Sequence, residues 1–221
     1  MRYVAAQMGH LDLVQRLLDA QALVDQARSH EVTPLYIAAQ SGHATVVHCL
    51  LRARADVNRR TELGTTALYI AAQENHVEAL QHLLEASADG SLPLGASGPL
   101  GAAPRCEGGG ATALHIAAQN GHLDAVRLLL QGGVDQGDRQ GVTALYAAAE
   151  HGHLAVVAAL LEAAASVAQA TLQGAAPLHV AARRGHRDIV APWQRNGLRT
   201  ARIVDVGAVF GRAPLEIEAF R

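Results

Sequence analysis

The stretch TALHIAAQNGHLDAVRLLL, residues 112–130, decides the fold because the chain repeats it with small changes. Residues 33–51 read TPLYIAAQSGHATVVHCLL, residues 66–84 read TALYIAAQENHVEALQHLL, and residues 143–161 read TALYAAAEHGHLAVVAALL. Each copy begins with threonine and a short apolar run, then passes a histidine into a second apolar run. The recurrence of one such unit along a chain is the signature of a repeat protein.

The spacing of the unit is nearly constant. The histidine between the two apolar runs, called the mark histidine below, falls at His10, His43, His76, His122, His153 and His186. Successive marks are 33 residues apart, except for one interval of 46 and one of 31. The long interval predicts an insertion of thirteen residues within 87–110, a segment rich in glycine and proline that we expect to form a loop. The short interval predicts a trimmed turn around 131–141.

Each unit carries the signals of two short helices joined by a tight turn. Thr33 can cap a helix through its hydroxyl, and Pro34 suits the first helical position. Gly42 then supplies the left-handed residue that ends this helix, and Asn75 takes that place in the next copy. Apolar residues at helical spacing follow, as at Leu50. Helices this short are unstable alone, so the pairs must stack to bury one continuous core.

These units resemble the ankyrin repeat, which has a period of about 33 residues and a T-P-L-H-x-A signature. The resemblance rests on TPLYIAA (33–39), TALYIAA (66–72), TALHIAA (112–118) and APLHVAA (176–182). It implies an all-α solenoid of stacked helix-turn-helix pairs, with about five full repeats and degenerate ends. We expect an ankyrin repeat domain over 1–190, followed by a degenerate repeat and the start of a truncated one over 191–221.

The two ends depart from the repeated pattern. Tyr3 aligns with Tyr36, so the capping threonine position of the first copy would lie before Met1. The final stretch, APLEIEAFR (213–221), stops inside its first helix. Solenoids usually end in polar capping repeats, so these ends suggest a piece of a longer array or a degraded array.

The sixth copy is also altered inside its second helix. Trp193 and Gln194 stand where other copies have two leucines, and Pro192 precedes them. A proline inside a helix removes a hydrogen bond and costs about 3 kcal/mol. We therefore expect this helix to end near Val190 or to kink, and 191–212 to be irregular.

Composition narrows the classes of partner. The net charge is −2, so the chain has no strong field to attract nucleic acid, and no apolar run is long enough for a membrane span. Only two cysteines are present: we expect Cys49 to be a small core residue and Cys106 to be exposed, which fits a reducing compartment. The predicted location is cytoplasmic, with the nucleus as an alternative, and the predicted state is a monomer.

Catalytic and metal-binding patterns are missing from the sequence. No G-x-S-x-G elbow is present, and no phosphate loop ends in Gly-Lys because the chain has no lysine. The mark histidines are one repeat apart, too far for shared ligation, and we expect them to bond to the backbone of neighbouring repeats. The pair of histidines in HATVVHC (43–49) does not change this expectation. The sequence predicts no enzyme activity, no cofactor and no metal.

The residues that follow the paired alanines should face the concave groove of the solenoid. With several of their neighbours, they are the predicted groove residues: Gln7, Gln40, Ser41, Gln73, Glu74, Gln119, Asn120, Glu150 and Arg183. The turns between repeats supply a second predicted set: Arg28, His30, Arg59, Arg60, Glu62, Asp138 and Arg139. In ankyrin-like proteins these two surfaces bind partners, although glutamine is also simply a good helix former.

The resemblance therefore predicts a non-catalytic module or scaffold that binds a partner protein through the groove and turn tips. An alternative is a regulatory ankyrin segment of a larger enzyme or channel. A third is a decayed array without a partner.

Asn58 allows a further functional interpretation. It ends LLRARADVN (50–58), which is similar to the site that asparaginyl hydroxylases accept in ankyrin repeats. The ordinary alternative is a turn asparagine.

Overall fold

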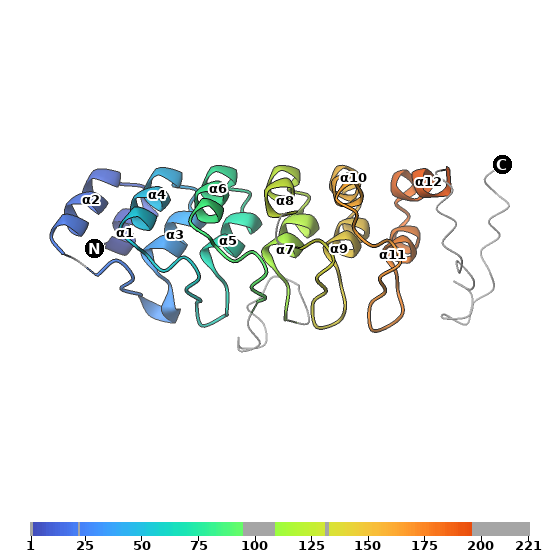
Figure 1. Cartoon of the computed structure of the whole chain (residues 1–221), viewed down its shortest axis with the longest axis horizontal. Helices are drawn as coiled ribbons and strands as arrows, with labels where there is room; N and C mark the ends of the chain where they lie inside the picture. The colour runs from blue at the N-terminus through green and yellow to red at the C-terminus, as the bar shows by residue number, and fades with distance from the viewer. Residues whose placement is uncertain (1, 22, 95–108, 131–132, 196–221) are drawn as a thin grey trace.

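The described part of the computed structural model, residues 2–21, 23–94, 109–130 and 133–195, is built from helices and loops without a strand (Figure 1). An inner row contains the first helix of each repeat: α1 (Arg2–Gln7), α3 (Pro34–Gln40), α5 (Ala67–Gln73), α7 (Ala113–Asn120), α9 (Ala144–His151) and α11 (Pro177–Arg184). An outer row contains the second: α2 (Leu11–Asp19), α4 (Ala44–Arg52), α6 (Val77–Glu85), α8 (Leu123–Leu129), α10 (Leu154–Glu162) and α12 (Arg187–Arg195). A short 3-10 turn, η1 (Ser29–Glu31), precedes α3. The predicted all-α solenoid of helix pairs is confirmed.

Local capping sets where the inner helices begin and end. The Thr33 hydroxyl accepts a hydrogen bond from the Tyr36 backbone N–H at 3.1 Å, and the threonines before α5 and α9 act in the same way. After the first helix, Gly42 has a φ of +75° and Asn75 has a φ of +59°, as their types predict. The same short signals therefore define each helix pair.

The inserted loop leaves the stack unbroken. Helix α5 packs directly against α7, and α6 packs against α8, as Figure 1 shows. The described ends of the loop are tied together: Leu94 N–H donates to the Ala111 carbonyl at 2.8 Å, and Gly110 N–H donates to the Leu94 carbonyl at 3.1 Å. The rest of the predicted insertion, 95–108, lies outside the described residues.

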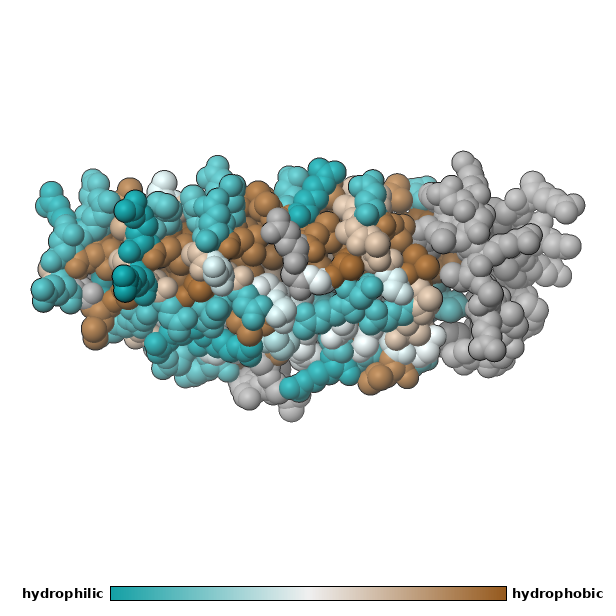
Figure 2. Space-filling model, viewed as in Figure 1, coloured by the Kyte–Doolittle hydropathy of each residue, from teal (hydrophilic) through white to brown (hydrophobic). Residues whose placement is uncertain are grey.

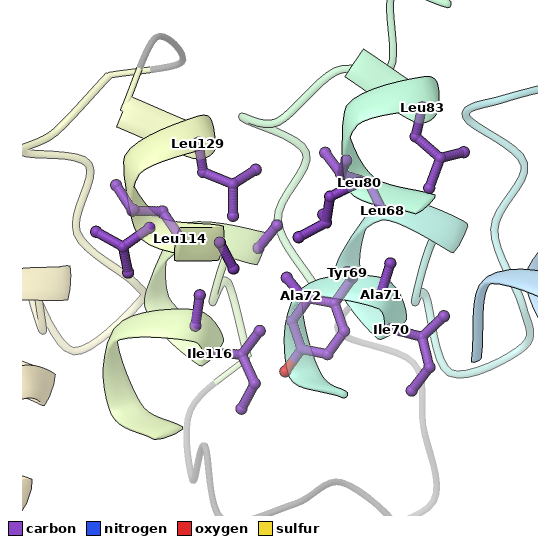
Figure 3. Packing of buried hydrophobic residues seen from close by; sticks show 14 of the residues in the cluster. Leu68, Tyr69, Ile70, Ala71, Ala72, Leu80, Leu83, Leu114, Ile116 and Leu129 are labelled. Carbon is purple, nitrogen blue, oxygen red and sulfur yellow. The ribbon is translucent and has the colours of Figure 1, made fainter. Parts of the chain in front are cut away.

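The core runs between the two rows. Paired alanines of the inner helices, such as Ala71 and Ala72, are fully buried and let neighbouring backbones approach closely. Leucines from both rows, such as Leu68 and Leu83, fill the space between them (Figure 3). Burying one such leucine contributes roughly 1.5–3 kcal/mol. Figure 2 shows apolar residues continuing as a band along one face, in keeping with the partly buried apolar side chains that pack against the core.

The sixth copy corrects one expectation. Its outer helix α12 continues to Arg195, so it does not end near Val190, and 191–195 are helical where an irregular segment was expected. A kink at Pro192 stays a prediction. Pro192 removes one backbone donor, but the first turn is held at His186, whose carbonyl accepts from Ile189 and Val190 at 3.2 Å. Ile189, in the same helix, is buried against the stack. The expectation for 196–212 falls outside the described residues.

Cys49 corrects a second expectation. Its side chain is half-buried at the rim of the core and not inside it. On α4 it lies between exposed His48 and buried Leu50, and burial still raises the pKa of its thiol. None of the helices in the described ranges is long and apolar enough to cross a membrane.

Candidate functional site

A ladder of histidines joins consecutive repeats. In each case Nε2 of a mark histidine donates to a backbone carbonyl of the preceding repeat. The pairs are His43 to Gln7 at 2.9 Å, His76 to Gln40 at 3.0 Å, His122 to Gln73 at 3.0 Å, His153 to Gln119 at 2.9 Å and His186 to Glu150 at 2.9 Å. The expected backbone role of these histidines is confirmed, and the insertion between α6 and α7 does not interrupt it.

The histidine ring also explains the glycine before four of the marks, Gly9, Gly42, Gly121 and Gly152. A Cβ added at Gly152 would lie 2.7 Å from Cε1 of His186, while the φ of Gly152 is +81°. Glycine is therefore needed there both for the left-handed turn and for the close approach of the next ring. Burial lowers the pKa of His153, and its neighbouring histidines add to the effect, while the hydrogen bond to the Gln119 carbonyl opposes it.

The ladder acceptors define a row of surface side chains on the inner helices. We call this the inner-helix row; it contains Gln7, Gln40, Gln73, Gln119 and Glu150, with Arg183 at the equivalent place in the sixth copy. Gln7, Gln40 and Arg183 are exposed, whereas Gln73, Gln119 and Glu150 are half-buried. One carbonyl per repeat is fixed by a histidine, so the side chains follow one another along the solenoid at the spacing of the repeats.

Neighbouring predicted groove residues bond along the same line. Asn120 Nδ2 donates to the Gln73 carbonyl at 3.2 Å, and Gln73 Nε2 donates to Glu74 Oε1 at 3.0 Å. Glu150 forms an ion pair with Arg184 at 2.5 Å. Ser41 is half-buried at the end of α3. The row thus changes from neutral amides near α1 to a charged pair near α11.

Some of the predicted turn-tip residues contact residues of the adjacent repeat. Nδ1 of His30 lies 2.7 Å from Glu62 Oε2, and the Glu62 backbone N–H donates to the His30 carbonyl at 3.1 Å. Arg59 pairs with Glu31 at 2.8 Å, a partner that the sequence analysis did not single out. Adjacent loops therefore support one another across the repeat boundary.

The remaining tip residues differ in their surroundings. The Arg28 guanidinium lies 5.2 Å from the centre of the Tyr3 ring, beside a cleft of about 420 Å³ at the first repeat. Asp138 Oδ1 accepts from two backbone N–H groups of its own loop at 2.8 Å, so it serves the turn. Arg60 and Arg139 are exposed.

Asn58 occupies a structural position. Its Oδ1 accepts from the Asp89 backbone N–H of the next repeat at 2.9 Å. Asp25 and Asp135 make the same kind of bond, to the backbone N–H groups of Asp56 and Ser166. Asn58 therefore joins its turn to the next repeat, and its hydroxylation stays a prediction.

His115 is a buried link that the sequence analysis missed. Its Nδ1 accepts from the Thr112 backbone N–H at 3.1 Å, and its Nε2 donates to the Val142 carbonyl at 2.8 Å. The ring is 3% exposed, and this burial lowers its pKa. The available signal was the change from tyrosine to histidine within TALHIAA.

In the described ranges, no three or more His, Cys, Asp or Glu side chains are grouped to hold a metal ion. The inner-helix row and the turn tips instead carry exposed amides, guanidinium groups and surface ion pairs. Such groups suit recognition of another polar surface.

Comparisons with known proteins agree with this geometry. The family model for ankyrin repeats (3 copies) matches residues 3–93 and 99–171. Among solved structures, the crystal structure of the human ASB11 ankyrin repeat domain is similar, with a TM-score of 0.75 and 27% sequence identity. The match covers 89% of this chain and 83% of that chain. A search of curated proteins finds no matching relative.

Proposed function

Because the chain belongs to the ankyrin repeat family, we propose that it is a non-catalytic module that binds a partner protein. The contact surface would be the inner-helix row with the adjacent turn tips. Fold alone does not name a partner, so the proposal rests on how these side chains are presented.

The observation that carries the proposal is the histidine ladder. It fixes one backbone carbonyl of the inner-helix row in each repeat, as from His43 to Gln7 and from His76 to Gln40. The side chains of Gln7 and Gln40 are exposed, so they lie on a rigid base without filling the core. A surface whose backbone is already ordered loses little conformational entropy when it binds.

The turn tips extend the same surface. The ion pairs of His30 with Glu62 and of Arg59 with Glu31 are largely exposed, and such pairs contribute only about 0–1 kcal/mol. Their charges can therefore be exchanged for contacts with a partner at little cost. Exposed Arg60 and Arg139 add guanidinium groups, which are enriched at protein interfaces.

A charge-matched pair of variants tests the proposal. The row variant changes Gln7, Gln40 and Gln73 to arginine, and the control variant changes Thr45, Ala155 and Ala158 to arginine. The control residues are exposed on α4 and α10, so both variants gain three positive charges. Circular dichroism should show helical folds in both, because surface substitutions usually change stability by less than about 0.5 kcal/mol.

The readout is quantitative proximity labelling in cells, followed by measurement of affinity with each purified candidate partner. We expect the row variant to lose specific partners that the wild type and the control variant both retain. Equal loss in both variants, or unchanged binding by the row variant, would contradict a binding role for the inner-helix row.

A further inference from the structure

Two histidine rings meet on the outer row, away from the proposed protein-binding surface. His48 lies on α4 and His82 lies on α6, the outer helices of adjacent repeats. Their ring centroids are 4.9 Å apart, and the ring planes are tilted by 48°. His48 is exposed and the His82 side chain is 32% exposed, so solvent ions can reach both.

The separation matches two imidazoles on one metal ion. A zinc–nitrogen bond is about 2.0–2.1 Å, which places each ring centroid roughly 3.2 Å from the metal. At a near-tetrahedral angle, the two centroids are then roughly 5 Å apart, close to the 4.9 Å between His48 and His82. The tilt also distinguishes this pair from His151 and His153, whose rings are almost parallel at 7° and 6.2 Å apart.

A carboxylate is already placed behind one ring. Glu85 Oε2 lies 3.4 Å from Nδ1 of His82, and Gln81 Nε2 donates to the other carboxylate oxygen at 3.2 Å. Histidines that bind metals usually donate their second ring N–H to a carboxylate or carbonyl, which orients the ring and raises its basicity. With Nδ1 of His82 engaged by Glu85, Nε2 is the nitrogen left for a metal.

We propose that His48 and His82 together bind one divalent transition-metal ion, such as Zn²⁺, on the outer-helix face. Imidazole nitrogen suits zinc, copper and nickel better than calcium or magnesium. In the described part of the chain no third protein ligand is grouped with this pair, so water completes the coordination sphere. The site is therefore open and exchangeable, and the bound ion links the second repeat to the third.

Histidine-selective NMR tests the site in the full chain. Zinc sulfate is titrated into protein with ¹⁵N-labelled histidines at pH 7.5, in a buffer that does not chelate metals. We expect the ring signals of His48 and His82 to shift together and saturate at one ion per chain. The melting temperature should rise with zinc concentration, because the ion binds the folded state.

Variants separate this pair from the other histidines. We expect H48A and H82A each to abolish the paired shift, with H48Q as a second variant that keeps the side-chain volume. E85Q should keep the stoichiometry and weaken zinc affinity on the order of 10-fold, as expected for loss of an orienting carboxylate. The control is H151A, which removes one member of the parallel pair and should leave binding at His48 and His82 unchanged.

The opposing results are equally specific. Zinc affinity unchanged in H48A and H82A, or zinc shifts confined to other histidine rings, would overturn the proposal. A shift of His48 that persists in H82A would show single-residue binding and would overturn it as well. These outcomes do not depend on the inner-helix row, so failure here leaves the proposed protein-binding function standing.

Discussion

The second repeat, α3 with α4, and the sixth copy, α11 with α12, share the same local design. Both inner helices begin with Pro-Leu and end before a glycine with a φ near +80°. In both, the mark histidine donates to the preceding repeat at 2.9 Å. The two copies nevertheless differ in how much they bury.

Leu35 of α3 is 1% exposed, whereas Leu178 at the equivalent place in α11 is only half-buried. Helix α3 packs between α1 and α5, while α11 packs against α9 as its one inner-row neighbour in the described residues. The difference teaches that local residue types define each helix pair, and that neighbouring repeats determine how well it is buried.

The largest expected effect comes from the equivalent leucines. Leu35→Ala should lower the free energy of unfolding by about 2–5 kcal/mol, because it empties a site enclosed on both sides. Leu178→Ala should cost clearly less, since its side chain already contacts solvent. Urea unfolding followed by circular dichroism measures both, and equal losses would refute the comparison.

A glycine pair sharpens the same contrast. A Cβ added at Gly185 would meet no atom within 4 Å. Gly185→Ala should therefore lower the free energy of unfolding only by the left-handed backbone penalty, about 1–2 kcal/mol. Gly152→Ala carries that penalty and also displaces the His186 ring, which should add roughly 1–3 kcal/mol. Thermal unfolding of the two variants ranks them, and a more damaging change at Gly185 would contradict the role assigned to the ring.

Acid should weaken the middle of the stack through His115. Burial lowers its pKa in the folded state, so the unfolded chain takes up a proton first as the pH falls below about 6.5. The free energy of unfolding therefore keeps its full value above pH 6.5. It declines below that pH by at most about 1.4 kcal/mol per pH unit. Unfolding of the wild type and H115Y across pH 7.5 to 5 measures this, with a shallower decline expected in H115Y. Identical pH profiles would argue against the linkage.

The helix caps should give the smallest effect. Thr33→Ala removes the hydroxyl that accepts from Tyr36, which should cost about 1 kcal/mol. Ala176→Thr supplies a hydroxyl that the sixth copy lacks and should stabilise it by at most about 1 kcal/mol. Urea midpoints compare the two changes, and a destabilising Ala176→Thr would contradict the expected cap.

The fold was predictable because its signals are local and repeated. Threonine caps, left-handed glycines and apolar spacing each occur within one copy, so the helix pairs at Thr33 and Thr66 follow from residue type alone. Pro192 and Cys49 were predicted less well. Helix α12 continues through Pro192 with Ile189 anchored in the stack, and Cys49 lies at the rim of the core. Such anchoring depends on contacts between copies.

The candidate site was predictable only as a row of positions. The sequence indicated that Gln40 and Gln73 follow buried alanines, but not that one is exposed and the other half-buried. Pairs such as His30 with Glu62 depend on how loops of adjacent repeats lie against each other. The approach of His48 to His82 has the same origin, since no pattern within one repeat contains both residues.

In the histidine ladder the acceptors are backbone carbonyls, so the side chains of the accepting residues can change during evolution. Every amino acid has that carbonyl, so glutamine and glutamate serve equally well as acceptors for His153 and His186. A mutation can therefore alter what the surface recognises without changing the bond that joins one repeat to the next. Selection for new partners and selection for a stable stack can act on the same residue independently.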